Sequence, residues 1–268
     1  GIEDLDRGII RCVGNPMERF NEDALRMMRA VRFAGQLGFS IESDTFNAIR
    51  TLKANLERVA VERMKVEFEK MILSPHRALA FQAFVESELY HSCPDFKEAK
   101  ETLLKLGEFP LEKMTITQAW ILFAYYERLS IPQLRKVLKN WKSSNDQIST
   151  ILTGYQTLLA RLEKEWDAFL AYECPEDLAV EVEQLLPGIG HSEQLVELDK
   201  VYQQLPIRSM KDIQIDGFGV KEALGLEKMG PIIGEVLQAL QTEILSGRLA
   251  NENADIVSWI RNSFNESK

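Results

Sequence analysis

Acidic and basic side chains stand close together in one short stretch, NEDALRMMRA (residues 21–30). Asp23 offers hydrogen-bond acceptors, whereas Arg26 only donates. Such a pair complements a base edge that presents an amino group beside a ring acceptor, as cytosine and adenine do. Uracil and guanine present the reverse pattern, and each group left unpaired would cost roughly 1–3 kcal/mol. The stretch therefore has the chemistry to admit C and A and to refuse U and G.

An ordinary structural role accounts for the same residues. Asn21 is a good N-cap, Glu22 and Asp23 suit the positive end of the helix that would follow, and Gly38 would end it. On that helix Arg26 would face Glu22 four residues earlier and Asp23 three residues earlier, each pair worth roughly 0.2–0.5 kcal/mol. Both interpretations remain open at this point.

A second candidate segment, RLSIPQLRKVLKNWK (residues 128–142), is predicted as an amphipathic helix with a basic polar side. It carries cations and no acid. Contact with phosphate needs only cations along one side of an element, although a solvated lysine face fits equally well. The candidate RNA-binding residues are Arg128, Arg135, Lys136, Lys139 and Lys142.

The overall composition restricts the class of protein to which the chain can belong. The chain has 268 residues, 45% hydrophobic and 27% charged, as expected for a soluble globular protein. The net charge of −9 argues against general polyanion binding, so any basic face is local. No stretch approaches the roughly 20 apolar residues of a membrane helix, and no signal peptide is evident. We expect a cytoplasmic protein, and the missing initial Met indicates a piece of a longer one.

Three other signals are weaker. The three cysteines and three histidines lack metal-ligand spacing, so no metal site is expected and the thiols are interpreted as buried or incidental. Asp4 and Asp6 form a lone DxD that precedes a strand instead of following one, which argues against a two-metal centre. LPGIG (residues 186–190) resembles a helix-hairpin-helix turn, but a connector between helices explains it better.

The elements that must position these residues are nearly all helical. The first fourteen residues hold the one convincing extended segment, GIIRCVG. Apolar periodicity then predicts helices over 21–37, 44–56 and 61–73, and near 76–87, 95–105, 116–127, 131–141, 145–170 and 175–186. After LPGIG, helices are predicted near 192–204, 218–225, 230–246 and 252–263, the last capped by Asn251. We predict an all-α protein with a short extended N-terminal segment.

Four segments of the sequence resemble one known protein family. ERFNEDALRMMRAVRFAGQLGF (18–39) closely resembles the class II tRNA nucleotidyltransferases, which comprise CCA-adding enzymes and bacterial poly(A) polymerases. GIEDLDRGIIRCVG at the N-terminus resembles that family's head-to-neck junction, and VAVERMKVEFEKMI (59–72) its closing neck helix. The segment from Ile213 to Ile260 resembles the tail of Gram-positive-type CCA-adding enzymes.

The resemblance implies a division of the chain and a set of site residues. Residues 1–14 would end the head, 15–74 form the neck, 75–187 the helical body and 188–268 the helical tail. The family's EDxxR element selects the incoming nucleotide, which implies a nucleotide-binding site at Glu22, Asp23 and Arg26. Arg29 would complete this site by reaching a phosphate or by bracing the acids. The neck-stabilising residues would be Glu62, Arg63 and Glu67. Asp4 would have a conformational role.

The resemblance also implies a function. The intact enzyme would add CCA to the 3′ end of tRNA from CTP and ATP with Mg²⁺, and body and tail would hold the acceptor stem and elbow. The Gly-Ser element and the metal-binding carboxylates of the catalytic head are missing, so this fragment holds no catalytic residue and is expected to be inactive alone. The alternatives are an ATP-only poly(A) polymerase, a CC- or A-adding specialist, or a non-catalytic helical RNA-binding module.

Overall fold

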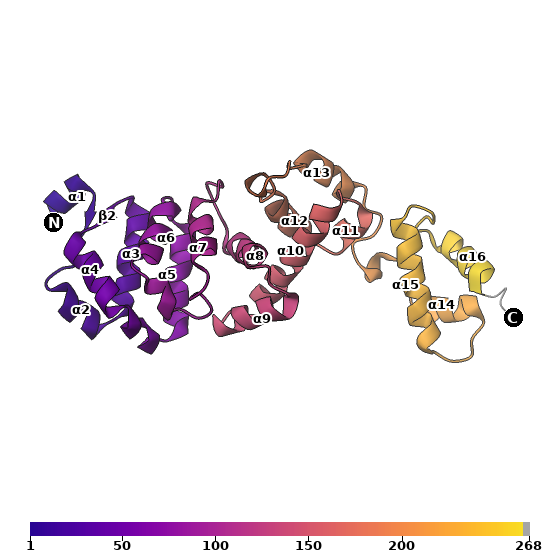
Figure 1. The fold of residues 1–268 in the computed structure, drawn as a ribbon. Coiled ribbons are helices and arrows are strands. Elements are labelled where there is room, and N and C mark those ends of the chain that lie inside the picture. The colour runs from indigo at the N-terminus through magenta and orange to yellow at the C-terminus, as the bar shows by residue number, and fades with distance from the viewer. Residues whose placement is uncertain (265–268) are drawn as a thin grey trace. The chain divides into compact units, whose positions relative to one another are not determined.

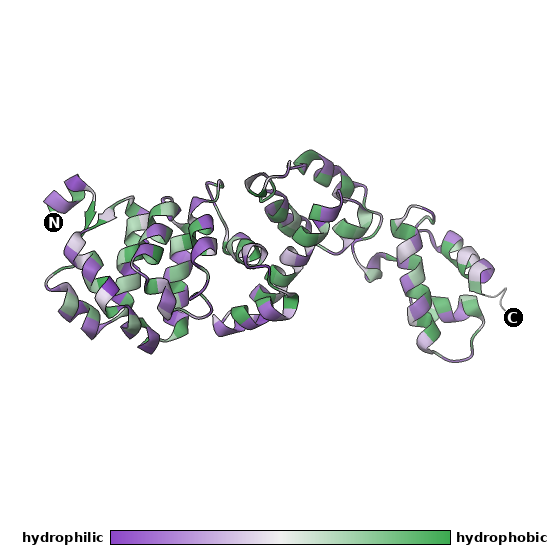
Figure 2. Ribbon diagram, viewed as in Figure 1, coloured by the Kyte–Doolittle hydropathy of each residue, from purple (hydrophilic) through white to green (hydrophobic). Residues whose placement is uncertain are grey.

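The computed structural model of the protein describes residues 1–264 (Figure 1). Within this range the chain forms sixteen α-helices, four short 3-10 helices and two strands of two residues each. Figure 2 shows hydrophobic and hydrophilic residues alternating along most helices, as expected for helices that bury one side. The predicted all-α class is confirmed.

Two compact units make up the chain. The first comprises residues 1–156 and 184–193, and the second comprises residues 157–183 and 194 onward. Helix α10 (Asn145–Glu163) begins in the first unit and ends in the second. The four-part division into junction, neck, body and tail remains a prediction.

The N-terminus is more helical than its sequence indicated. Helix α1 (Ile2–Arg7) ends at Gly8, whose φ of 66° is left-handed. Strand β1 (Ile9–Ile10) then pairs in parallel with β2 (Ser40–Ile41). The predicted extended segment is thus shorter than expected, and its partner lies just beyond Gly38.

The stretch 21–30 does not form the single helix that was predicted. Helix α2 (Pro16–Glu22) begins earlier, because Asn15 accepts hydrogen bonds from the amides of Met17 and Glu18 and Pro16 occupies the first turn. Asp23 is extended, with φ −148°, and α3 (Leu25–Leu37) starts after it. The predicted N-cap role of Asn21 is therefore wrong, whereas the predicted end of the helix at Gly38 is confirmed.

Most of the rest of the first unit follows the predicted periodicity, but the helix predicted near 95–105 begins only at Lys100, and the one predicted near 145–170 ends at Glu163. Helix α5 (Val61–Leu73) matches its predicted range to the residue, whereas α4 (Ser43–Leu52) passes into a 3-10 helix, η1 (Lys53–Arg58). The remaining elements are α6 (Arg77–Glu86), η2 (Leu89–Ser92), α7 (Lys100–Glu108), α8 (Ile116–Glu127), α9 (Ile131–Asn140) and η3 (Pro187–Ile189).

An aromatic cluster forms the core of the first unit. Phe68 of α5 packs against Phe81, Phe96 and Trp141 with ring centroids 5.1–5.9 Å apart. Trp141 donates its indole N–H to the carbonyl of Pro94 at 2.9 Å, so its polar atom is satisfied inside the core. Helix α5 therefore has one side fixed in this core and the other available to α3.

The second unit contains the end of α10, α11 (Ala168–Tyr172), α12 (Glu176–Glu183), α13 (Leu195–Gln203), η4 (Met210–Asp212), α14 (Gly217–Leu224), α15 (Pro231–Leu245) and α16 (Asn253–Phe264). One apolar cluster surrounds Trp166 and Leu198, and another surrounds Val236 and Ile256. The predicted cap at Asn251 is wrong, because its amide group bonds to Asp212 and Gln214 in the turn before α14.

Candidate nucleotide-selecting site and nucleic-acid interface

Asp23 lies in the break between α2 and α3, where two groups hold its carboxylate. Its Oδ1 accepts a hydrogen bond at 3.1 Å from the amide of Leu25, the first residue of α3, whose amide has no partner within the helix. Its Oδ2 accepts from Nη2 of Arg63 on α5 at 3.4 Å. The Asp23 side chain is still 26% exposed, so it can accept further hydrogen bonds from a ligand.

Glu22 and Arg26 form an ion pair across the same break. The distance from Nη1 of Arg26 to Oε2 of Glu22 is 3.1 Å, and Nη1 of Arg19 lies 3.3 Å from the same oxygen. The hydrogen bond from Arg26, supported by Arg19, lowers the pKa of Glu22 below its ordinary value of 4.5. Glu22 thus fixes one end of a guanidinium that is 40% exposed.

The prediction that the side chains of Asp23 and Arg26 face each other on one helix is wrong. Residues 1–264 contain no ion pair between them, because Asp23 is outside both helices and bonds to Arg63 instead. Only the backbones are joined, by the amide of Arg26 donating to the carbonyl of Asp23 at 3.1 Å. The two side chains are therefore held separately at the start of α3, each by a different charged neighbour.

Glu67 of α5 is a buried carboxylate that contacts α3. Its side chain is 4% exposed and lies between two arginines of α3, with Arg29 Nε at 3.3 Å and Arg32 Nε at 2.6 Å. Asp23 contacts Arg63, and further along the chain Arg29 and Arg32 contact Glu67, so the contacts advance in the same direction on both sides. Helices α3 and α5 therefore run parallel. Arg29 thus pairs with an acid of α5 and, within residues 1–264, with neither of the EDxxR acids. Arg32, for which no role was predicted, pairs with the same carboxylate.

Glu62, the third residue predicted to stabilise the neck, is exposed and has no hydrogen bond or ion pair within the described part of the chain. Helix α5 therefore contacts the α2–α3 break through Arg63 and α3 itself through Glu67. Sequence spacing could not reveal this, since the residues that meet are 35 to 40 positions apart.

The predicted basic segment forms the exposed side of α9 and its flanks. Leu134, Val137 and Leu138 are buried, whereas the cations are exposed. None of the cations takes part in an ion pair within residues 1–264, and the five are Arg128, Arg135, Lys136, Lys139 and Lys142. Their ammonium and guanidinium groups are therefore available to an external anion.

A protein-family model described as tRNA nucleotidyltransferase domain 2 matches residues 111–260, more than half of the chain. The chain belongs to the tRNA nucleotidyltransferase family. A second model, described as the probable RNA- and SrmB-binding site of polymerase A, matches residues 38–100. The two matches cover most of both units, and the α2–α3 break lies outside both of them.

Curated relatives of this tRNA nucleotidyltransferase chain are similar over nearly all of its length. A CCA-adding enzyme of Ligilactobacillus salivarius is 36% identical over 258 residues, which are 96% of this chain and 64% of the relative. One from Enterococcus faecalis is 36% identical over 262 residues, 97% of this chain and 64% of the relative. The chain thus spans a little less than two thirds of these relatives.

Solved structures of CCA-adding enzymes are also similar to nearly all of the chain. The CCA-adding enzyme of Bacillus stearothermophilus in complex with CTP has a TM-score of 0.89 and 29% identity, covering 99% of this chain and 68% of that one. A CCA-adding enzyme with ATP has a TM-score of 0.61 at 21% identity, covering 99% of this chain and 65% of that one, which speaks for the fold alone.

The part of this tRNA nucleotidyltransferase chain that the structure describes brings together no group of three or more His, Cys, Asp or Glu side chains suited to a metal. Asp4 and Asp6 lie two positions apart on α1, where side chains do not face each other. Asp4 instead pairs with Arg11 at 3.1 Å, which lowers the pKa of Asp4. These residues do not fit Mg²⁺.

Two further sequence signals have structural explanations. Gly188 of LPGIG packs so closely on Phe109 that an added Cβ would lie 2.3 Å from the ring, which supports the connector interpretation. Cys93 and Cys174 are buried free thiols, as expected, and Cys12 is half-buried. In residues 1–264, no helix combines the length and the apolar character needed to cross a membrane.

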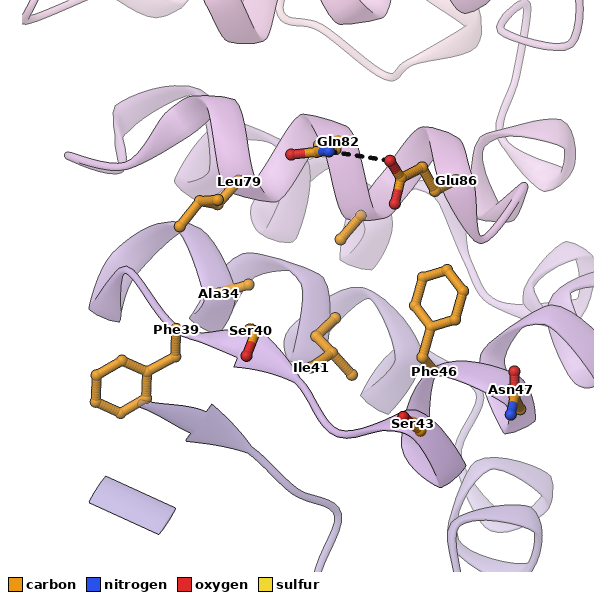
Figure 3. Close-up of a pocket in the computed structure, with 11 residues that line it drawn as sticks. Ala34, Phe39, Ser40, Ile41, Ser43, Phe46, Asn47, Leu79, Gln82 and Glu86 are labelled. Atoms are coloured by element: carbon orange, nitrogen blue, oxygen red, sulfur yellow. Dashed lines mark hydrogen bonds between the residues drawn. The ribbon is translucent and has the colours of Figure 1, made fainter. Parts of the chain in front are cut away.

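A cavity of the first unit lies away from the α2–α3 break. It has a volume of about 410 Å³ and opens between α6 and the segment that follows α3 (Figure 3). Phe39, Ile41 and Phe46 line one side of it and Leu79 of α6 the other, and Gln82 donates a hydrogen bond to Glu86 at its edge at 3.0 Å. None of the residues predicted to select a nucleotide lines it.

Proposed function

We propose that this chain is the nucleotide-selecting and tRNA-binding portion of a CCA-adding tRNA nucleotidyltransferase. The intact enzyme would add C, C and A to the 3′ end of tRNA from CTP and ATP. The support is the family membership, relatives that are named CCA-adding enzymes, and a similar solved structure that is a complex with CTP. A cytoplasmic location is part of the same proposal.

One observation carries the nucleotide-selecting part. At the start of α3 a partly exposed carboxylate and a partly exposed arginine lie on either side of one turn, and a second charged residue braces each of them: Arg63 for Asp23 and Glu22 for Arg26. A braced pair loses little conformational entropy on binding, which favours selection by hydrogen-bond pattern. Asp23 would accept from the base amino group and Arg26 would donate to the ring nitrogen, a pattern that cytosine and adenine share.

The second part of the proposal concerns RNA. The five cations of α9 and its flanks are exposed and lack ion-pair partners in the described chain, so a polyanion would meet no competing carboxylate on these side chains. Contacts to the acceptor stem and elbow of tRNA are expected from the resemblance. Mg²⁺ is expected to bind in the head.

The decisive test of selection replaces Asp23 by Ala in a whole protein that carries a catalytic head. With a tRNA that lacks its 3′ end, the unchanged protein should add CCA, and the variant should misincorporate U or G while remaining folded. Asp167→Ala is a matched control, because Asp167 also caps a helix, by accepting from the amide of Leu170 at 2.9 Å. Equal fidelity in both variants would leave the acids of EDxxR as helix caps only.

The same assay decides between this proposal and its rival. A poly(A) polymerase would add A alone to arbitrary RNA, whereas a CCA-adding enzyme requires a tRNA-like end and stops after three nucleotides. The comparisons do not favour the polymerase, since the curated relatives quoted above are named CCA-adding enzymes. Addition of A alone would overturn the CCA proposal.

A further inference from the structure

A polar groove lies beside the basic face, between α9 and α10. Its volume is about 350 Å³, at the small end of the range for ligand sites. Arg135 of α9 forms one side, and Asn145, Ser149, Thr153 and Gln156 of α10 supply the uncharged polar groups. No acid lines it, although the whole chain has a net charge of −9.

The groove follows from the spacing of α10. Its four polar residues lie four, four and three positions apart and so share one side of the helix. Ile148 and Leu152 are buried at 7% and 6% exposure and form the apolar floor. Helix α9 presents Ile131 and Arg135, one turn apart, to the same space. Two amphipathic helices thus place a row of neutral polar groups next to a cation.

Several of these groups are free to bind a ligand. Arg135, Ser149 and Gln156 are exposed, and within residues 1–264 none of their side chains has a hydrogen bond or ion pair to another residue. A hydroxyl and an amide side chain can each donate and accept, whereas the guanidinium only donates. The groove therefore combines one site for an anion with two sites for groups that both donate and accept.

We propose that this groove holds the ribose edge of an RNA duplex that lies along α9, with Arg135 on a phosphate and Ser149 and Gln156 on 2′-hydroxyl groups. The inference rests on the RNA-binding role proposed for α9. The 2′-hydroxyl both donates and accepts, and it distinguishes RNA from DNA. Ser149 and Gln156 are seven residues apart, about 10 Å along the helix, so they meet different riboses.

The groove supplies what the basic face lacks. Cations that touch phosphates position a nucleic acid but do not distinguish RNA from DNA. Neutral groups in a row beside them add that distinction without adding charge. Removal of a cation and removal of a neutral group should therefore have different signatures in binding experiments.

The experiment uses the chain of residues 1–268 with an RNA hairpin and a DNA hairpin of the same sequence, and measures affinity by fluorescence anisotropy at several salt concentrations. The double variant Ser149→Ala, Gln156→Ala should lose roughly threefold to tenfold in RNA affinity for each lost hydrogen bond. DNA affinity and the salt slope should stay unchanged. Thr150→Ala, exposed on the same helix but outside the groove, is the matched control and should change nothing.

The outcomes separate this inference from the function on which it rests. Lys136→Gln and Lys139→Gln should weaken both hairpins alike and reduce the salt slope by about one each. If they do so while the double variant affects RNA and DNA equally, or neither, the groove proposal is overturned and the basic face stands. If the lysine variants bind both hairpins as tightly as the parent chain, both proposals fail.

Discussion

Glu183 in the second unit and Asp23 in the first are both carboxylates held by an arginine. Glu183 has no exposure and accepts four hydrogen bonds, from Nε and Nη2 of Arg161 at 3.0 and 2.9 Å, from the indole of Trp166 at 2.6 Å and from the amide of Gln194 at 3.0 Å. Asp23 accepts two, at 3.1 and 3.4 Å, and its side chain is 26% exposed.

The difference separates a carboxylate that stabilises the fold from one that can meet a ligand. All four acceptor directions of Glu183 are used, so no ligand could bind there without breaking the unit. Asp23 keeps unused lone pairs that face solvent and yet is oriented by its two donors. Residue type and an arginine partner do not distinguish the two sites, whereas exposure and the number of satisfied hydrogen bonds do.

The largest expected effect is at Glu183. Glu183→Gln places an amide N–H against donors and leaves Arg161 buried without its counter-charge, so we expect a loss of about 3–5 kcal/mol in the stability of the second unit. Native-state hydrogen exchange would show this as lost protection of α11 to α13, while amides of the first unit keep theirs.

Glu197→Gln is the control for this change, because Glu197 is an exposed acid on α13. It should alter stability by less than about 0.5 kcal/mol. A similarly small loss in Glu183→Gln would show that the buried pair of Glu183 and Arg161 contributes little to the stability of the second unit.

Glu67 lies between the two extremes and tests whether burial sets the scale. Its carboxylate is buried between Arg29, which is 43% exposed and can regain water when the charge is lost, and Arg32, which is 12% exposed and regains less. Glu67→Gln should therefore cost about 1–3 kcal/mol, measured by urea unfolding. Glu69→Gln on the same helix removes a half-exposed pair with Lys65 and should cost less than about 1 kcal/mol. Equal losses would mean that exposure does not order these sites.

At Asp23 the expected change in stability is smaller, because the site is open. Asp23→Ala removes the acceptor for the Leu25 amide and should cost about 1 kcal/mol of unfolding free energy. Asp23→Asn keeps an acceptor there and should cost less than half as much, as thermal unfolding of the two variants would show. If both variants lost the same amount, the Arg63 ion pair would be the main contribution and the cap would be minor.

The sequence predicted helices well where one apolar period runs uninterrupted. Helix α5 matched from Val61 to Leu73 because Met64, Phe68 and Met71 repeat at helical spacing and face the aromatic core. The break at Asp23 was not predicted, because an acid at that point suits the first turn of a helix as well as a cap before it. Its contact with Arg63, 40 residues away, distinguishes the two conformations.

The same limit applies to the buried acids. Glu183 lies in a segment whose apolar periodicity predicted a helix, and nothing nearby distinguishes it from a solvated acid. Its donors Arg161 and Gln194 are 22 and 11 residues away. The chemistry of the EDxxR residues could be stated from their types alone, whereas their bracing by α5 required the tertiary structure.

The smallest expected effect concerns Glu22, the most exposed of these acids. Its pKa is lowered mainly by the hydrogen bond from Arg26, so the pair stabilises the folded chain above the ordinary pKa of 4.5 and this contribution is lost as pH falls through the lowered value. Because both side chains are exposed, salt should weaken the effect. An NMR titration of the Glu22 carboxyl would measure it directly.

Two variants separate the causes of that shift. Arg26→Gln should return the Glu22 pKa most of the way toward 4.5, whereas Arg19→Gln should raise it less, because the Arg26 hydrogen bond is the stronger influence. If Arg19→Gln had the larger effect, Glu22 would be bound mainly within α2 and Arg26 would be free to move. The braced guanidinium on which nucleotide selection depends would then lack its support, although the buried carboxylates would remain as they are.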